Sequence, residues 1–352
     1  MDQFLEALGE LPGAHAELDW SDTGGQDRRY DAQIDLWVAG KAVTLLVEVK
    51  KAFYPRDVRQ TLWQLKDFAN KWPRTVEGHQ TAPLLVAQSI SPGAKDLLRG
   101  EGVGYYDSGG SMFLPAESIY VYIDKPPPKN LSKSIRSLFS GRRAQVLQVL
   151  LMQPTEWFGV KSVAEQAKVS PATASQVLAE LEKFDWVISR GQGPSKERHL
   201  REPGALLDAW VKQLSVMRSP AMRRYFVPAA RAEVLVDKFA EACAVHNADY
   251  AITHEAAGQH YTPFLSTFSQ VRCRLMAGAA ADRALGELDA RVVTEGANLA
   301  VIEVKSPGEL LFREQVDGVW LASPVQVYLD LMRGEGRAKE LAQHLRRERI
   351  GF

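Results

Sequence analysis

The sequence is short of the features that mark secreted and membrane proteins. It holds two cysteines, Cys243 and Cys273, whose positions match neither a metal-ligand spacing nor a disulfide framework. Such a low cysteine content is typical of proteins in a reducing compartment. No apolar run reaches about 18 residues, the length that marks a membrane-spanning helix. The first residues, MDQFLEALGELPG, lack the basic start and long apolar stretch of a signal peptide. We therefore expect a cytoplasmic protein.

The chain also lacks net charge, because 43 Lys and Arg residues balance 43 Asp and Glu residues. The distribution along the chain is uneven. Residues 124–201 hold 13 Lys or Arg against 7 Asp or Glu, so the remainder is acidic. A basic middle between acidic flanks is typical of a module that binds an acidic partner. A solvated surface gives the same pattern, so charge alone does not decide between the two.

The order of strand-like and helix-like segments predicts a mixed α/β protein with several domains. Turns at Gly24-Gly25 and Gly40-Lys41 separate the first three expected strands. A Pro-rich basic segment, DKPPPK, then interrupts the regular structure. The expected parts are an α/β domain at 1–123, a basic Pro-rich linker at 124–141, a domain of three helices and a charged hairpin at 142–205, and a second α/β domain at 206–352.

Two carboxylates and a lysine stand close together in the strands of the first part. Alternate side chains of a strand share one face, so Glu48 and Lys50 point the same way while Val49 faces the core. Asp35 lies 13 residues before Glu48, and a short hairpin is expected to bring the two carboxylates together. Such a pair predicts a Mg²⁺ (or Mn²⁺) site, because Mg²⁺ is held by one or two carboxylates with waters and phosphate. Asp31 shares the strand face of Asp35 and is the alternative; Asp35 is preferred for its apolar neighbours.

The same residues suit phosphodiester hydrolysis. A bound metal polarises a phosphate oxygen and lowers the pKa of its water, and Lys50 would orient that water and stabilise negative charge. Gln60 and Gln64 lie four residues apart on one face of the next expected helix and would brace the site.

This pattern resembles the PD-(D/E)XK nuclease superfamily over residues 1–123: a strand Asp, a Glu-x-Lys strand, then a helix carrying Gln. Ile34 stands where the motif has Pro. The resemblance implies a restriction-endonuclease-like mixed sheet and an acidic residue on the first helix, Glu6 or Glu10. The implied catalytic residues are Asp35, Glu48, Lys50, Gln60 and Gln64, with the metal held by Asp35, Glu48 and the backbone carbonyl of Val49.

Residues 142–201 have the spacing of a winged helix-turn-helix. Ser170 is expected to cap a helix that begins at Pro171. Helix-turn-helix geometry places the start of that helix in the major groove of DNA, and the hairpin after it suits phosphate contacts. The candidate DNA-binding residues are Thr173, Ser175 and Gln176 for base edges, and Arg190, Lys196 and Arg198 for phosphates. The segment looks like a bacterial winged-helix regulator. A winged helix used only for protein contacts or dimerisation is the alternative.

The last part carries two motif segments, one near residue 250 and one near residue 330. They resemble the abortive-infection AbiE-type (type IV) antitoxin and transcriptional regulator family, over roughly residues 142–352. His254 stands where that family would have Gly. The resemblance implies an autorepressor that opposes a nucleotidyltransferase-like toxin. The matching residues are Tyr250, Thr253, Ala257, Ser323, Gln326, Tyr328, Asp330, Leu331, Arg337 and Leu345.

Two weaker signals lie in the same part. A second Glu-x-Lys, Glu303 to Lys305, follows Asp289 by 14 residues and suggests either a duplicated nuclease site or an ordinary charged strand. His254, Glu255 and His260 suggest either a metal site or structural histidines, and the structural interpretation is favoured.

The sequence therefore predicts a DNA-binding protein whose Mg²⁺-dependent nuclease domain is brought to double-stranded DNA by a winged helix, in mobile-element or phage-defence biology. The main alternative is a transcriptional repressor and antitoxin with an inert nuclease fold and a toxin partner. An adaptor that uses neither site chemically is a third hypothesis. A homodimer is plausible, because winged-helix regulators often bind paired half-sites.

Overall fold

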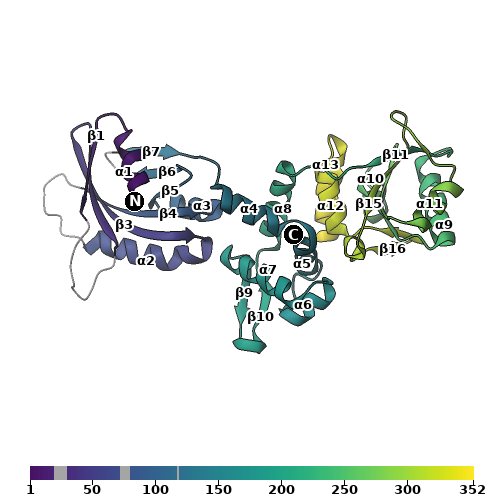
Figure 1. Cartoon of the computed structure of the whole chain (residues 1–352), viewed down its shortest axis with the longest axis horizontal. Helices are drawn as coiled ribbons and strands as arrows, with labels where there is room; N and C mark the ends of the chain where they lie inside the picture. The colour runs from purple at the N-terminus through teal and green to yellow at the C-terminus, as the bar shows by residue number, and fades with distance from the viewer. Residues whose placement is uncertain (20–29, 72–79, 117–118) are drawn as a thin grey trace. The chain divides into compact units, whose positions relative to one another are not determined.

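The computed structural model describes residues 1–19, 30–71, 80–116 and 119–352. It divides into two compact units, Met1–Ser137 with Ala179–Asp185, and Leu138–Leu178 with Trp186–Phe352. Both units combine helices with sheets, which confirms the expected mixed α/β class (Figure 1). The turn expected at Gly24-Gly25 lies outside the described residues.

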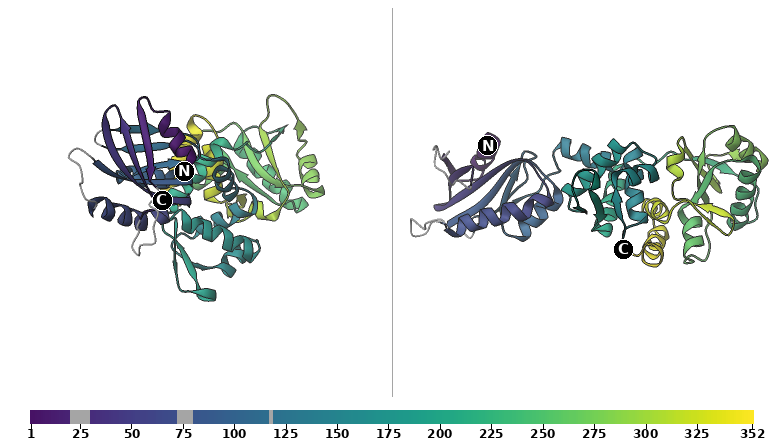
Figure 2. Two further views of the ribbon diagram at one scale, coloured as in Figure 1. Left: turned by 60° about the vertical axis from the view of Figure 1, so that its left-hand side comes forward. Right: turned by 90° about the horizontal axis from the view of Figure 1, so that it is seen from below.

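A seven-stranded sheet forms the centre of the first unit. Its elements are α1 (Asp2–Gly9), β1 (Ala14–Asp19), β2 (Ala32–Val38), β3 (Lys41–Phe53), α2 (Pro55–Lys71), β4 (Gln80–Ile90), α3 (Pro92–Gly100), β5 (Gly104–Asp107), β6 (Met112–Pro115), β7 (Tyr120–Ile123) and α4 (Lys129–Leu138). The strands lie in sequence order, with β3, β4 and β5 parallel and the other neighbours antiparallel. Helix α1 packs on one face, and α2 and α3 pack on the other (Figure 2).

The central hairpin follows directly from its sequence. Strand β3 has five consecutive buried residues, Val43–Val47, because a strand in the parallel part of a sheet is covered on both faces. Val38 pairs with Lys41, so β2 and β3 are joined by a two-residue turn. Both turn residues, Ala39 and Gly40, have positive φ (51° and 79°), as a type I′ turn requires.

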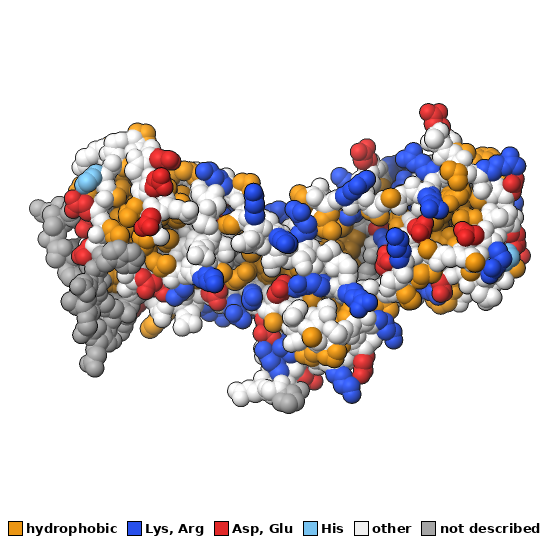
Figure 3. Space-filling model, viewed as in Figure 1, with side chains coloured by type: hydrophobic (Ala, Val, Ile, Leu, Met, Phe, Trp, Pro, Cys, Tyr) orange, Lys and Arg blue, Asp and Glu red, His pale blue; other side chains and the backbone are white. Residues whose placement is uncertain are grey.

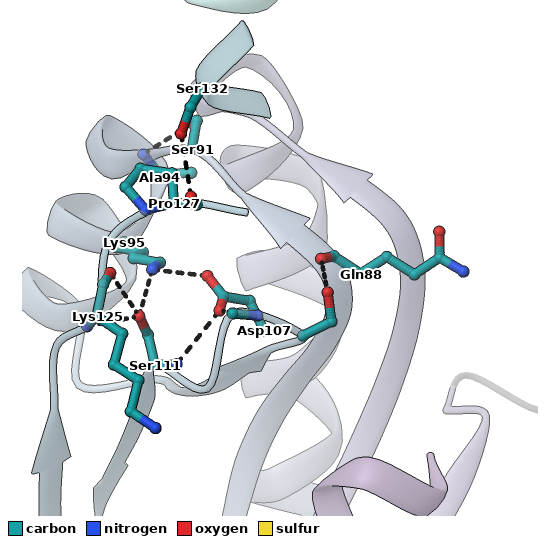
Figure 4. Close-up of polar contacts among 11 residues, drawn as sticks. Gln88, Ser91, Ala94, Lys95, Asp107, Ser111, Lys125, Pro127 and Ser132 are labelled. Atoms are coloured by element: carbon teal, nitrogen blue, oxygen red, sulfur yellow. Dashed lines mark hydrogen bonds and ion pairs between the residues drawn. The ribbon is translucent and has the colours of Figure 1, made fainter. Parts of the chain in front are cut away.

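A buried ion pair ties α3 to the end of β5 (Figure 4). Lys95 Nζ lies 2.6 Å from Asp107 Oδ2 and donates to Ser111 Oγ over 2.7 Å. Asp107 Oδ1 accepts from the backbone N–H of Gly109 at 2.9 Å. Lys95 is 6% exposed and Asp107 is fully buried. Charges this deep are tolerated only when they are paired and hydrogen-bonded.

The segment predicted as a linker contains a helix in its second half. Residues 124–128 have no regular structure, but α4 begins at Lys129, directly after the prolines. Proline fits the start of a helix because its missing N–H would have no partner there. Ser132 Oγ donates to the carbonyl of Pro127 at 3.0 Å and fixes this start (Figure 4).

The second unit contains a three-stranded and a seven-stranded sheet. Its helices and strands up to α8 are α5 (Gly141–Met152), β8 (Trp157–Gly159), α6 (Val160–Gln166), α7 (Pro171–Lys183), β9 (Val187–Arg190), η1 (Gly193–Ser195), β10 (Glu197–Leu200) and α8 (Pro203–Val216). Helix α7 runs into the 179–185 segment that clusters with the first unit. The small sheet has the order β8-β10-β9 and is antiparallel throughout.

The larger sheet of this unit has the order β14-β11-β15-β13-β12-β17-β16. Its elements are β11 (Arg223–Phe226), α9 (Ala232–His246), β12 (Tyr250–Thr253), α10 (His254–Tyr261), β13 (Val271–Met276), α11 (Ala279–Glu287), β14 (Arg291–Val292), β15 (Leu299–Val304), η2 (Pro307–Leu310), β16 (Glu314–Val316), β17 (Val319–Leu321), α12 (Pro324–Met332), α13 (Arg337–Leu345) and η3 (Arg346–Ile350). Helices α9 and α11 pack together, as do α10, α12 and α13. In Figure 1 the two groups lie on opposite sides of the sheet. Within the described ranges, no helix is both long and apolar enough to cross a bilayer.

We predict that Lys95→Met lowers the free energy of unfolding of the first unit by about 3–5 kcal/mol, because it leaves Asp107 buried without its partner. Urea unfolding of the full chain, with hydrogen exchange of β5 as a local readout, measures the loss. Lys66→Met is the matched control: its partner Glu101 is 2.6 Å away but both side chains are about half exposed, so we expect a change of about 1 kcal/mol or less. Equal losses in the two variants would contradict the prediction.

Candidate functional sites

The register of the β2–β3 hairpin separates Asp35 from Glu48. Asp35 lies opposite Thr44, whose hydroxyl donates to Asp35 Oδ1 at 2.6 Å. Gln33 Nε2 donates to the other oxygen of the same carboxylate at 3.1 Å. Glu48 lies four residues beyond Thr44, which is about 13 Å along a strand. The expectation that a short hairpin places Asp35 beside Glu48 is therefore wrong, although both share one face of the sheet.

Asp31, which directly precedes β2, is the acidic residue held at the part of β3 that carries Glu48. Ala32 pairs with Val47, and the backbone N–H of Asp31 donates to the carbonyl of Val47 at 2.8 Å. The backbone N–H of Val49 donates to Asp31 Oδ2 at 2.7 Å. The sequence placed this turn at Gly40-Lys41, one residue too late, and counting outward from that position would have set Gln33 opposite Glu48. The flanking apolar residues that favoured Asp35 only report that it lies within a strand.

Glu48 and Lys50 share a face as predicted, and Lys50 Nζ forms an ion pair with Glu48 Oε1. The expectation that Val49 between them faces the core is wrong, because Val49 lies beyond the buried part of β3 and is exposed. The Lys50 side chain is 42% exposed and that of Glu48 is 13% exposed. On α2, Gln60 is exposed and Gln64 is half-buried. Within the described residues, neither amide forms a hydrogen bond with Asp31, Asp35 or Glu48.

Helix α1, with Glu6 and Glu10, packs against Val43, Leu45 and Val47, which is the sheet face opposite to Glu48. Neither glutamate therefore joins Glu48. Among the residues that the structure describes, no three His, Cys, Asp or Glu side chains cluster as a metal site would need.

The helix α7 begins where the sequence predicted. The backbone N–H of Thr173 donates to Ser170 Oγ at 3.2 Å, which satisfies an N–H group of the first turn. The hydroxyl of Thr173 also bonds to Ser170 Oγ at 2.9 Å. Thr173 and Ser175 are half-buried, whereas Gln176 and its neighbour along the helix face, Ala172, are exposed. Of the three predicted base-contacting residues, Gln176 is thus the most accessible.

The β9–β10 hairpin holds two of its three predicted phosphate-binding residues in other contacts. Arg190 bonds Glu197, its cross-strand partner, at 2.7 Å, and its guanidinium lies 4.1 Å from the ring centre of Trp157. Arg198 is only 7% exposed, so its assignment to phosphate contact is wrong. It lies two residues before the buried Leu200, on the inward face of the central strand. That alternation was readable in the sequence. Lys196 is half-buried.

A buried carboxylate organises the C-terminal sheet. Asp330 is 3% exposed, and its Oδ1 lies 2.8 Å from Arg274 Nη2. Thr253 Oγ1 donates to Asp330 Oδ2 at 2.6 Å, and Gln326 Nε2 donates to Oδ1 at 2.9 Å. Burial raises the pKa of Asp330, but the charge of Arg274 and the hydrogen bonds from Arg274 and Thr253 outweigh it and lower the pKa. Gln148 of α5 donates to Gln326 at 2.9 Å and extends the network. The two motif segments of this part thus meet at Asp330.

His254 sits beside this network in a strained position. Its φ is +56°, a region that residues other than glycine rarely adopt. It is 4% exposed, and its Nδ1 has no hydrogen-bond partner. The positive φ explains why glycine would suit this position. Strain and an orphaned buried polar atom persist only where the surrounding fold imposes them, and they cluster at functional sites.

The residues behind the two weaker sequence signals do not come together in a common site. Asp289 pairs with Arg291 at 2.7 Å, and Glu303 pairs with Arg223 at 3.4 Å. Strand β11 separates β14 from β15, so the aspartate and the second Glu-x-Lys do not form a duplicated site. Glu255 forms an ion pair with Arg272 at 3.1 Å, so its carboxylate is not available to a metal site with His254 and His260. Both cysteines are buried, and burial raises the pKa of Cys243 to about 12.

No family model, curated protein or solved structure matches the chain. The resemblances to PD-(D/E)XK nucleases and to AbiE-type regulators therefore stay predictions from sequence.

We predict that His254 makes the second unit lose stability in mild acid. Burial lowers its pKa below the ordinary 6.5, against the opposing effect of Asp330. Below about pH 6.5 the unfolded chain therefore binds a proton that the folded chain refuses. The free energy of unfolding falls over that range, by at most about 1.4 kcal/mol per pH unit.

Urea unfolding over a pH series tests this against His254→Asn, which does not titrate and tolerates positive φ. We expect the wild type to lose stability relative to the variant as the pH falls from about 7 to about 5. Parallel curves for the two proteins would refute the assignment.

Proposed function

We propose that the chain binds duplex DNA through residues 141–201, acting as a winged helix. Helices α6 and α7 are joined by a short turn at 167–170, and the β9–β10 hairpin follows. Such an arrangement lets the second helix enter the major groove while the hairpin lies along the backbone.

The observation that carries this proposal is the exposed start of α7. Ala172 and Gln176 lie on one exposed helix face with no bulky side chain between them. A glutamine amide can pair with adenine in two hydrogen bonds, and an alanine methyl can contact the methyl of thymine. A helix that served only as a packing element would more commonly place charged residues there.

Exposed lysines flank this face. Lys161 at the start of α6 has an 88% exposed side chain, and Lys168 in the turn is exposed. Lys and Arg side chains are prominent over the part of the chain that contains α5 to α8 in Figure 3. Such charges position a protein on DNA by contacting phosphates without reading sequence.

The test compares Gln176→Ala and Lys168→Gln on DNA. Duplexes are first enriched from a random pool with the wild type, and binding is measured by fluorescence anisotropy over a salt series. Gln176→Ala should weaken binding to the enriched sequence about 5- to 100-fold and leave random DNA unaffected. Lys168→Gln should weaken both equally and reduce the salt slope by about one.

Lys238→Gln, an exposed lysine on α9, is the control and should change neither quantity. If the wild type enriches no sequence and shows no salt-dependent affinity for duplex DNA, the proposal fails.

We propose metal-dependent phosphodiester hydrolysis as a second function, located at Asp31, Glu48 and Lys50. Asp31 bonds to the backbone on either side of Glu48, at Val47 and Val49, and Lys50 lies on the face of Glu48. One oxygen of Asp31 is held by Val49, which leaves the other for a cation. Two adjacent carboxylates fit Mg²⁺, which would polarise a scissile phosphate and activate water. Lys50, released from Glu48, would then stabilise negative charge on the phosphate.

Cleavage of plasmid and linear DNA with Mg²⁺, Mn²⁺ or EDTA tests this second function. Asp31→Asn and Lys50→Ala should each reduce cleavage at least about 100-fold. Asp35→Asn should leave it within about threefold of the wild type, because that carboxylate is engaged by Thr44 and Gln33. Loss of cleavage in Asp35→Asn alone would restore the original assignment of Asp35.

A protein that binds DNA tightly and cuts no nucleic acid would instead favour the repressor and antitoxin alternative. The meeting of Thr253, Gln326 and Asp330 from the two AbiE-like segments supports it. Co-purification with a neighbouring nucleotidyltransferase-like protein would then be expected.

A further inference from the structure

A small cavity opens beside Asp330 in the C-terminal sheet domain. Its volume is about 210 Å³, and it lies between β11, the β12–α10 junction, β13 and the end of α12. Its polar lining comes from Arg224, His254, Gln270, Arg272, Asp330 and Arg333.

The acidic groups at this cavity already have partners. Asp330 is neutralised by Arg274, which contacts both of its oxygens, and it also accepts hydrogen bonds from Thr253 and Gln326. Glu255 is bonded by both oxygens to Arg272. These contacts leave no uncompensated negative charge at the cavity from either carboxylate.

Two arginines at the cavity keep their charge unmatched. Arg333 Nη1 donates to the hydroxyl of Ser219 at 3.1 Å, a neutral acceptor. Arg224 is exposed on β11. In the part of the chain that the structure describes, neither guanidinium has a carboxylate within ion-pair distance. The cavity therefore carries a positive potential that an anion would neutralise.

His254 supplies an independent reason to expect a ligand. It lines the cavity, it is 4% exposed, and its Nδ1 lacks a hydrogen-bond partner. Leaving such a buried group unsatisfied is destabilising, and its positive φ adds strain. A ligand oxygen or hydroxyl in the cavity would satisfy the ring.

We propose that this cavity binds the phosphate group of a small phosphomonoester. Arg224 and Arg333 contact the phosphate oxygens, and His254 bonds a third oxygen. A single arginine satisfies a carboxylate through two parallel hydrogen bonds, whereas a phosphate has three oxygens and a charge near −2, which match two arginines and a third partner.

A second cavity has room for the part of the phosphomonoester that lies beyond its phosphate group. It measures about 460 Å³ and shares Pro220, Asp330 and Arg333 with the first. Its wall includes Trp210 and the amides of Gln145 and Gln148. An aromatic ring with amide groups suits a polar, planar or hydroxylated group such as a nucleobase or a sugar.

Calorimetric titration of the full chain tests the proposal with defined probes: inorganic phosphate, AMP, ribose 5-phosphate and, as the uncharged counterpart, adenosine. We expect inorganic phosphate to bind weakly, at least one phosphomonoester to bind at least tenfold more tightly, and adenosine not to bind. Binding of inorganic phosphate with no gain from either ester would overturn the phosphomonoester and leave a bare anion site.

Two neighbouring arginines on β11, Arg224 and Arg223, provide a test variant and its matched control. Arg224→Gln should weaken phosphomonoester binding at least tenfold. Arg223→Gln removes another exposed arginine from the opposite strand face, where it pairs with Glu303, and should leave affinity unchanged. His254→Gly should also weaken binding while relieving the strained φ, and a retained thermal unfolding midpoint shows that its fold is intact.

Two outcomes would overturn the site. One is that none of the phosphorylated probes binds at millimolar concentration. The other is that Arg223→Gln and Arg224→Gln bind alike. Competition by random duplex DNA serves as a further arm: displacement of the bound phosphomonoester by DNA, lost in Arg224→Gln, would reassign the cavity to a nucleic-acid phosphate.

Discussion

The bidentate contact between Arg274 and Asp330 is the interaction on which the C-terminal domain depends. It joins β13 to α12, and the hydrogen bond from Thr253 adds β12 to the same centre. Through Gln326 and Gln148 the network reaches α5, the first helix of the proposed DNA-binding segment. Removing one partner of such a buried pair leaves an uncompensated charge and costs far more than the intact pair contributes. These elements are therefore held in one arrangement by electrostatics as well as by apolar packing.

The same physical rule applies in the first unit, where Lys95 and Asp107 link α3 to β5. There Lys95 also bonds to Ser111, and Asp107 Oδ2, which accepts no hydrogen bond, lies 2.6 Å from the Lys95 ammonium group, so the pair is structural. At Asp330 the carboxylate is equally satisfied, but its neighbour His254 is not. The buried atom without a hydrogen bond has an ion-pair partner at Asp107 but none at His254, and this difference separates the structural pair from the candidate binding site.

Charge and register also explain which predicted site residues lie in a position to act. Asp31, Glu48 and Lys50 gather at one end of the β2–β3 hairpin, while Asp35 is held four residues away by Thr44. In the DNA-binding segment, Gln176 is exposed on α7 whereas Arg198 is buried in the small sheet. In both places the residue types suggested by the sequence were chemically reasonable, and strand pairing decided which of them are available.

Local signals in the sequence determined the mixed α/β class, the positions of the main strands, the start of α7 at Pro171 and, to within one residue, the β2–β3 turn. Each depends on backbone sterics or on hydrogen bonds within a few residues, which short stretches of sequence encode. The tertiary structure alone decided that Thr253, Arg274 and Asp330 meet, since they lie far apart in the chain and only the packing of β12, β13 and α12 brings them together. It likewise decided that His254 is buried with an unpartnered nitrogen, because burial depends on every element packed around a residue and not on its neighbours in sequence.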